Sequence, residues 1–286
     1  MEDKVSYALV DSGLGRKLER FGPYLLDRPC TQAIWRPKLS SQQWAKADAC
    51  FTREGGKAWL KKSHLPEHWL VEIGGLCLKA SSTDFGHLGI FPEHASMWCW
   101  IRSLIRKAMT KRQGAPNILN LFAYSGGATL SVAAEGAKVC HVDSSKGMID
   151  WAKENAANNQ LSSASIRWIV EDVNKFLSRE LRRGVSYDGI ILDPPTFGRG
   201  RRGEVFKIEE HILEILDKCR SLLSENPLFV LFSCHTPGYT PLIMEKLLKQ
   251  ALKGLEGEVE YGEMFLPAQE IDSRVPSGTY SRWFYE

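Results

Sequence analysis

The chain has 286 residues and a formal net charge of +3, with 43% apolar and 25% charged side chains. A chain of this length can bury a full core, and these fractions exclude disordered, fibrous and membrane-spanning classes. So small a net charge does not by itself indicate nucleic-acid binding.

The seven cysteines are scattered without paired spacing, which favours reduced thiols and no metal site. The start, Met1 to Lys4, lacks the pattern of a signal peptide, and no apolar run is long enough to span a bilayer. We therefore expect a cytoplasmic protein without a membrane partner. The sequence carries no indication of an oligomeric state.

Residues 1–84 read as short strands punctuated by glycine and proline. Strands are expected at Tyr7–Val10, Lys17–Phe21, Thr31–Trp35, Trp69–Ile73 and Leu76–Lys79. This predicts a small β-rich region, a candidate for substrate or RNA recognition. Its tryptophans are expected in the core rather than as platforms that stack bases; they are Trp35, Trp44, Trp59 and Trp69.

A helix is expected from Glu93 to Lys111, because Pro92 sets its start and apolar residues recur at helical spacing from Met97 onward. Its arginines and lysines are expected on a solvated outer face.

From Ile118 strands and helices alternate. Strands are expected near Ile118, Ala137, Ile166, Tyr187 and Pro227, and helices from about Gly127, Lys146, Val173, Val205 and Thr240. Such alternation predicts a parallel sheet covered on both faces. Two final strands, Glu258–Leu266 and Thr279–Tyr285, have no helix between them and predict a β-hairpin. Residues 85–286 are thus expected to form the catalytic domain.

The centre of that domain is a glycine turn. The apolar run Ile118–Phe122 meets Gly126 and Gly127, and a helix follows; glycines let the backbone approach a ligand closely. The next strand ends in Asp143, where a carboxylate can accept hydrogen bonds from ribose hydroxyls. The pattern favours a nucleoside-containing cofactor, and a purely structural turn is the alternative.

A second motif, Asp193-Pro194-Pro195-Thr196-Phe197, follows the strand that ends at Leu192. The two prolines stiffen the turn, so Asp193 points into the crevice where ligands of such sheets bind. The loop after it carries three arginines that could clamp RNA phosphates or lie in solvent: Arg199, Arg201 and Arg202.

A third motif, Ser233-Cys234-His235, follows the fifth strand. A Cys234 thiolate could add to C6 of a cytosine and make C5 nucleophilic, while Asp193 hydrogen-bonds the base and supplies a proton. The alternative is that Cys234 is a buried structural cysteine. His235 is not expected to activate Cys234 directly, because successive side chains on a strand point to opposite faces.

In order, these motifs resemble those of class I S-adenosylmethionine-dependent methyltransferases. The resemblance implies an α/β, Rossmann-like fold with a mostly parallel seven-stranded sheet and a terminal hairpin. It implies that the glycine turn holds the methionine part of S-adenosylmethionine, Asp143 the ribose, and the segment from Glu171 to Val173 the adenine.

From Phe85 onward the chain is similar to the bacterial family that contains the 23S ribosomal RNA cytosine-C5 methyltransferases, whose Asp-Pro-Pro-x-Phe and Ser-Cys motifs match Asp193 to Phe197 and Ser233-Cys234. The chain departs from that family in three ways: no PUA domain is found, Thr196 replaces a lysine, and His235 replaces a serine. The motifs and the resemblance together assign to cofactor binding Phe91, Pro92, Glu93, Phe122, Ala123, Tyr124, Ser125, Gly126, Gly127, Asp143, Ser144, Asp172, Val173, Asp193 and Pro194. They assign to substrate binding Pro195, Thr196, Phe197, Arg199, Arg201 and Arg202.

Three hypotheses follow. In the first, the protein methylates C5 of a cytosine in ribosomal RNA, with Cys234 and Asp193 as catalytic residues. In the second, the methyl acceptor is a nitrogen or oxygen of another nucleic acid, a protein or a small molecule, and Cys234 only packs. In the third, the chain is a non-catalytic RNA-binding module that keeps a methyltransferase fold.

Overall fold

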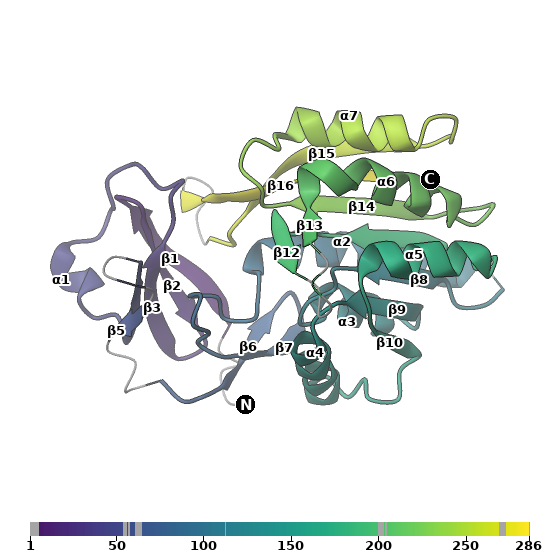
Figure 1. The fold of residues 1–286 in the computed structure, drawn as a ribbon. Coiled ribbons are helices and arrows are strands. Elements are labelled where there is room, and N and C mark those ends of the chain that lie inside the picture. Colours follow the sequence, from purple (N-terminus) through teal and green to yellow (C-terminus); the bar gives the residue numbers. More distant parts are fainter. Residues whose placement is uncertain are drawn as a thin grey trace. The chain divides into compact units, whose positions relative to one another are not determined.

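The computed structural model describes residues 6–53, 56, 58–60, 65–111, 113–199, 203, 205–268 and 273–285. The chain divides into two compact units (Figure 1). The first comprises Met1–Ser96 and Phe265–Ser277, and the second comprises Met97–Met264 and Gly278–Glu286. The sequence suggested a single boundary between residues 84 and 85. In the structure the first unit runs further and also includes a segment close to the C-terminus.

The first unit contains a five-stranded sheet and a separate hairpin. The sheet has the order β1 (Tyr7–Gly13), β2 (Arg16–Phe21), β3 (Tyr24–Pro29), β4 (Ala49–Thr52) and β5 (Ala58–Leu60), with the short helix α1 (Ser41–Trp44) between β3 and β4 along the chain. The hairpin consists of β6 (Trp69–Ile73) and β7 (Leu76–Ala80). Four of the five predicted strands of this region are confirmed.

The strand predicted at Thr31–Trp35 is wrong. This segment forms turns whose carbonyls at Ala33 and Trp35 accept hydrogen bonds from the turn between β1 and β2. The strand of this region is β3, which comes before this segment in the sequence. The charged residues of β3 obscured the alternation of apolar and polar side chains along the strand. One of them, Arg28, is buried and forms an ion pair with the fully buried Glu19, with a separation of 2.6 Å.

The tryptophans are tied into this unit through their indole N–H groups. Trp69 is buried and donates to the Phe21 carbonyl, and Trp44 donates to the Asp11 carboxylate. Trp35 and Trp59 also donate to backbone carbonyls, but the Trp35 side chain is exposed. The expectation of core positions therefore fits Trp69 best.

The second unit is built on a seven-stranded sheet with the order β10, β9, β8, β11, β14, β16, β15. Its parallel strands are β8 (Asn117–Leu121), β9 (Lys138–Asp143), β10 (Ile166–Val170), β11 (Gly189–Leu192) and β14 (Phe229–Cys234). β16 (Pro276–Phe284) pairs antiparallel with β14, and β15 (Glu258–Phe265) lies outside it. The α/β, Rossmann-like fold with a terminal hairpin is confirmed.

Helices cover both faces of this sheet (Figure 1). On one face α5 (Val173–Arg182), α6 (Ile208–Ser221) and α7 (Pro241–Ala251) share a core with alternate strand residues such as Leu121, Val142 and Phe232. On the other, α2 (Ala95–Lys111) and α3 (Gly127–Ala133) pack on the intervening residues such as Ile118 and Leu231, and α4 (Lys146–Asn158) packs beside α3. Within the described ranges no helix is long and apolar enough to cross a membrane.

The helix predicted to start near Val205 begins at Ile208 instead. Val205–Lys207 form β13, which pairs with β12 (Phe197–Arg199) in a small antiparallel hairpin directly after the Asp193 motif. The aromatic ring of Phe206 packs between Phe122 and His211, with ring centroids 5.2 and 5.5 Å away. Packing of Phe206 therefore keeps Val205–Lys207 in a strand, and the helix begins only after it.

A buried carboxylate joins α5 to the sheet. Glu180 is fully buried and accepts hydrogen bonds from Arg167 on β10 at 3.0 and 3.1 Å and from the Tyr187 hydroxyl at 2.8 Å. Burial raises the pKa of Glu180, but these hydrogen bonds outweigh burial and lower its pKa overall. The group is therefore ionised at neutral pH.

We expect Glu180→Gln to lower the free energy of unfolding by about 2 kcal/mol, because it weakens the charge-assisted hydrogen bonds that a fully buried carboxylate accepts from Arg167 and Tyr187. Chemical denaturation at pH 7 measures this. Arg183→Ala is the control, because Arg183 contacts the same carboxylate from an exposed position. Equal small losses in both variants would contradict the prediction.

Candidate active site

The carboxyl ends of four strands meet at one edge of the sheet of the second unit. The strand registers place Leu121 beside Val142 on one side and Leu192 on the other, and Leu192 beside Phe232. The residues that directly follow these positions are therefore neighbours. This is the edge at which open α/β sheets bind ligands.

The turn after β8 has an unusual backbone. Phe122 and Tyr124 have φ values of 54° and 49°, in the left-handed region that non-glycine residues rarely adopt. Hydrogen bonds hold the turn in place, from the Ala123 N–H to the Val142 carbonyl and from the Gly126 N–H to the Ala123 carbonyl, each 3.1 Å. The surrounding structure therefore keeps strained backbone at this site.

The two glycines permit close packing of this turn. Gly126 has φ 92°, and a Cβ there would lie 3.0 Å from the Ala152 Cβ on α4. A Cβ on Gly127 would lie 2.3 Å from Cζ2 of Trp98 on α2. The turn thus rests on two helices with no room for a side chain at either position.

Asp143 at the end of β9 faces this turn. Its Oδ2 accepts a hydrogen bond from the Tyr124 N–H at 2.9 Å, and its Oδ1 accepts one from the Ser145 N–H at 2.8 Å. Both bonds orient the carboxylate as an acceptor beside Ser144. Burial raises the pKa of Asp143 above that of an ordinary aspartate.

Asp172 follows β10 at the same edge. Its Oδ1 accepts a hydrogen bond from the Lys175 N–H at 3.0 Å and so caps α5, while Val173 is buried. Glu171 forms an ion pair with Arg179 at 2.8 Å. The capping bond fixes Asp172 next to Asp143 along the row of strand ends, where it can hold a second part of the cofactor.

Phe91, Pro92 and Glu93 belong to the first unit. They lead through a 3-10 turn, Pro92–His94, into α2, and the buried Glu93 carboxylate accepts a hydrogen bond from the Ser277 hydroxyl at 2.8 Å. Their predicted role at the cofactor stays a prediction.

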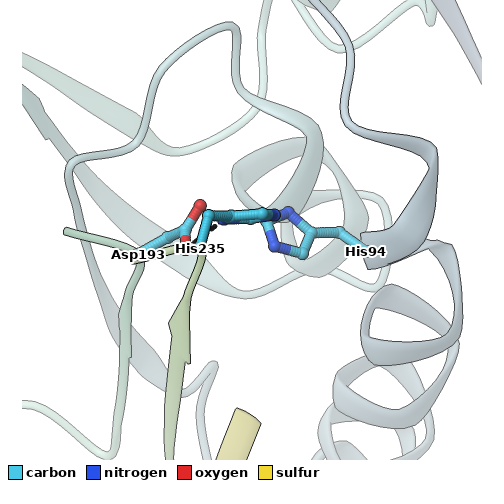
Figure 2. Close-up of side chains that lie close together, drawn as sticks. All are labelled: His94, Asp193 and His235. Atoms are coloured by element: carbon cyan, nitrogen blue, oxygen red, sulfur yellow. Dashed lines mark ion pairs between the residues drawn. The ribbon is translucent and has the colours of Figure 1, made fainter. Parts of the chain in front are cut away.

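Asp193 stands at the end of β11 between two polar side chains from the end of β14. Its Oδ1 accepts a hydrogen bond from the Ser233 hydroxyl at 2.9 Å and lies 3.5 Å from Nδ1 of His235. Figure 2 shows the carboxylate and the His235 imidazole next to each other. The Asp193 and His235 side chains are 25% and 32% exposed, so a ligand can approach both.

The sequence missed Ser233 and His235 as partners of Asp193. Alternation along β14 was the signal that could have found Ser233, because it lies on the same face as Leu231 and opposite Phe232. His235 follows the end of the strand, where alternation no longer applies.

The rest of the Asp193 motif is mostly exposed. Pro194 is buried, whereas Pro195, Thr196 and Phe197 face solvent. The Thr196 and Thr236 hydroxyls form a hydrogen bond of 2.8 Å, which joins the motif to the loop after β14. Arg201, Arg202 and the side chain of Arg199 lie outside the described part of the chain.

Cys234 has a different environment from Ser233. It is 1% exposed and belongs to the core beneath α6 and α7, together with Phe232 and Met244. Its Sγ accepts a hydrogen bond from the Thr236 N–H at 3.4 Å, and burial raises the pKa of the thiol. The structure therefore places this thiol among packing residues, in its less reactive protonated form.

Comparison with known proteins gives the family of the chain. The pattern of a family described as S-adenosylmethionine-dependent methyltransferase matches residues 53–247. The chain belongs to this methyltransferase family. The protein is therefore an enzyme whose cofactor is S-adenosylmethionine.

Solved structures agree. The S-adenosylmethionine-dependent methyltransferase from Agrobacterium tumefaciens is 38% identical with a TM-score of 0.91, and the match covers 98% of this chain and 91% of that chain. Trm5b from Pyrococcus abyssi is 14% identical with a TM-score of 0.56, covering 96% and 76%, and shows the fold alone.

Among curated relatives, the Ribosomal RNA large subunit methyltransferase K/L of Shewanella sp. (strain MR-4) is 32% identical over 181 residues, which are 61% of this chain and 24% of that protein. The homologue from Shewanella frigidimarina is 31% identical over 61% of this chain and 23% of its own length. The chain thus spans about a quarter of the length of the curated relatives it matches.

The residues at the strand ends fit this cofactor. Close packing of Gly126 on α4 and of Gly127 on α2 fixes the turn from Phe122 to Gly127 at the edge where such sheets bind ligands. Asp143 and Asp172 offer carboxylate acceptors for hydroxyl and amino groups. The turn, Asp143 and Asp172 are therefore the residues that we propose bind S-adenosylmethionine.

We expect Gly127→Ala to weaken binding of S-adenosylhomocysteine by about tenfold or more, because the new Cβ displaces Trp98 or the turn. Isothermal titration calorimetry measures this. Gly147→Ala on α4 is the control, since its Cβ would have only the Ser145 Oγ nearby, at 3.9 Å. Unchanged affinity in Gly127→Ala would contradict the prediction.

We expect Asp143→Asn to weaken S-adenosylhomocysteine binding by about 10- to 100-fold, as for lost hydrogen bonds to a charged group. Because burial raises the pKa of Asp143, the affinity of the wild type should begin to fall at a higher pH than it would with an ordinary aspartate. The variant should lack that fall. Titrations at several pH values measure both effects. Asp150→Asn, which changes a partly exposed carboxylate on α4, should bind as wild type.

Proposed function

We propose that this methyltransferase transfers a methyl group to a ring or amino nitrogen of a base in RNA. The observation that carries the proposal is the Asp193 carboxylate, oriented by Ser233 and partly exposed at the ligand-binding edge of the sheet. The names of the curated relatives support ribosomal RNA of the large subunit as the substrate. Because the match covers only about a quarter of these relatives, their substrate is part of the proposal.

The chemistry assigns Asp193 a simple role. S-adenosylmethionine supplies an electrophilic methyl group on a sulfonium centre. Asp193 accepts a hydrogen bond from the N–H of the acceptor and aims the nitrogen lone pair at the methyl carbon. As the new N–C bond forms, the methyl–sulfur bond breaks and S-adenosylhomocysteine leaves, and Asp193 takes the proton that the nitrogen loses. The buried Pro194 stiffens the turn that holds the carboxylate.

Nitrogen transfer needs no protein nucleophile, which matches the position of Cys234. The thiol is 1% exposed on the core face, and Ser233 points from the same strand to Asp193. On this reading Cys234 packs against α6 and α7. The proposal therefore takes the nitrogen acceptor and the packing role of Cys234 from the second hypothesis of the sequence analysis, and ribosomal RNA from the first.

Cytosine-C5 methylation is the second candidate. One observation favours it: Cys234 is the last residue of β14 and directly follows the partner of Asp193. For this chemistry the thiol must become exposed and ionised, and burial opposes both. The route therefore requires a rearrangement of the loop after β14 when RNA binds.

RNA contacts complete the proposal. The β12–β13 hairpin begins at Phe197, directly after the Asp193 motif, and the sequence adds Arg199, Arg201 and Arg202 there. We assign phosphate contacts to these arginines, and contacts with the acceptor base to Pro195, Thr196 and Phe197. The first unit is our candidate for recognition of the surrounding RNA.

The test is transfer of radiolabelled methyl from S-adenosylmethionine to unmodified ribosomal RNA, with nucleoside analysis of the product. Label in an N-methylated nucleoside that survives Cys234→Ala supports the proposal. Asp193→Asn should lower kcat by about 100-fold or more, because an amide cannot take the proton.

Cys219→Ala is the control for Cys234→Ala, because both cysteines are buried in the same core. Label in 5-methylcytidine that disappears only in Cys234→Ala would replace nitrogen transfer by the cytosine-C5 route. Absence of label in every RNA, with cofactor binding intact, would move the search to other acceptors.

A further inference from the structure

A chain of buried polar groups lies behind the cofactor turn. The Asn120 side-chain amide on β8 donates a hydrogen bond to the Thr129 hydroxyl on α3 at 2.8 Å. The same hydroxyl is 2.8 Å from Nδ1 of His141 on β9. The three side chains are between 0% and 3% exposed. Such groups are costly to bury, and no step assigned above uses them.

The donors around His141 favour one tautomer. The Thr129 oxygen accepts a hydrogen bond from Asn120, and in the favoured arrangement the hydroxyl donates its own proton to Nδ1 of His141. Nδ1 must then carry a lone pair, and the neutral ring carries its proton on Nε2. Burial lowers the pKa of His141 to about 3, so the ring is neutral at physiological pH.

The remaining N–H group of this ring faces the cofactor turn. Nε2 of His141 is buried and has no hydrogen-bond partner within the described residues. The backbone of Tyr124 is the group that favours the protonated form of this ring, and Cε1 lies 3.8 Å from the Cβ position of Gly126. On β10 the Trp168 ring packs against the imidazole at 4.8 Å and limits its rotation.

Tyr124 therefore lies between two residues of one strand. Its N–H donates to the Asp143 carboxylate, and its backbone lies near His141, two residues earlier on the same face of β9. Tyr124 is also one of the two strained residues of the turn, with φ 49°. A left-handed tyrosine needs neighbours that hold it in place.

We propose that His141 is a positioning residue for S-adenosylmethionine, whose Nε2–H holds the Tyr124 carbonyl when the cofactor is bound, and whose tautomer is set by Thr129 and Asn120. Asp143 and His141 then hold the two peptide groups on either side of the strained residue Tyr124. The turn is thereby preorganised for the cofactor. This inference rests on the cofactor of the family and not on the proposed RNA acceptor.

The test compares Thr129→Val with Thr129→Ser in binding of S-adenosylhomocysteine by calorimetry. Valine keeps the shape but removes the hydroxyl, so affinity should fall by about tenfold, as for one lost buried hydrogen bond. Serine keeps the hydroxyl and should restore binding. Ser131→Ala is the matched control, because Ser131 is buried on the same helix and its hydroxyl has no partner within the described residues.

Kinetics separate positioning from packing. In Thr129→Val the KM for S-adenosylmethionine should rise while kcat at saturating cofactor stays near that of wild type. A lower melting temperature with unchanged affinity and KM would overturn the inference, because the chain would then only stabilise the fold. The binding experiment contains no RNA, so its result tests this inference even if the RNA proposal fails.

A second measurement uses the wild-type protein and stays decisive if Thr129→Val does not fold. Nitrogen NMR of histidine-labelled protein should show His141 neutral with its proton on Nε2, and this N–H signal should shift when S-adenosylhomocysteine is added. A proton on Nδ1, or a signal unchanged by the ligand, would overturn the inference.

Discussion

The hydrogen bond from the Tyr124 N–H to the Asp143 carboxylate, 2.9 Å long, joins the turn after β8 to the end of β9. It forms because parallel pairing brings Leu121 beside Val142, so that the segments following the two strands begin side by side. Together with the hydrogen bond from the Ala123 N–H to the Val142 carbonyl, it anchors the left-handed backbone of the turn to β9. The proposed cofactor site depends on this contact.

The alternation of side chains along the strands separates chemistry from packing. On β9, His141 and Asp143 lie on the face of α3, whereas Cys140 and Val142 lie in the core beneath α5. On β14, Ser233 contacts Asp193, whereas Phe232 and Cys234 contribute to the same core. A cysteine and a serine that are adjacent in sequence therefore have different roles.

The two sides of the site differ in exposure. At the proposed cofactor turn, Gly126 and Gly127 leave no space between the turn and the helices behind it, which favours a rigid site. In the Asp193 motif, Pro195, Thr196 and Phe197 face solvent, and the Thr196–Thr236 hydrogen bond joins the motif to the loop after β14. This contrast is consistent with the proposed function, in which the turn holds a small cofactor and the motif admits RNA.

The sequence by itself determined the order of strands and helices from Ile118 onward, the turn at Gly126 and Gly127, and the acidic positions Asp143, Asp172 and Asp193. Local signals carry this information: apolar runs, glycines, and the two prolines after Asp193. The extent of the first unit, the strand β3 with its buried Arg28, and the hairpin before α6 came only from the tertiary structure, because each depends on pairing with distant residues. The same holds for the bond between Ser233 and Asp193, the buried position of Cys234, and the chain from Asn120 to His141. Sequence spacing shows where a strand ends, but only the packed sheet decides which side chains meet there and which are buried.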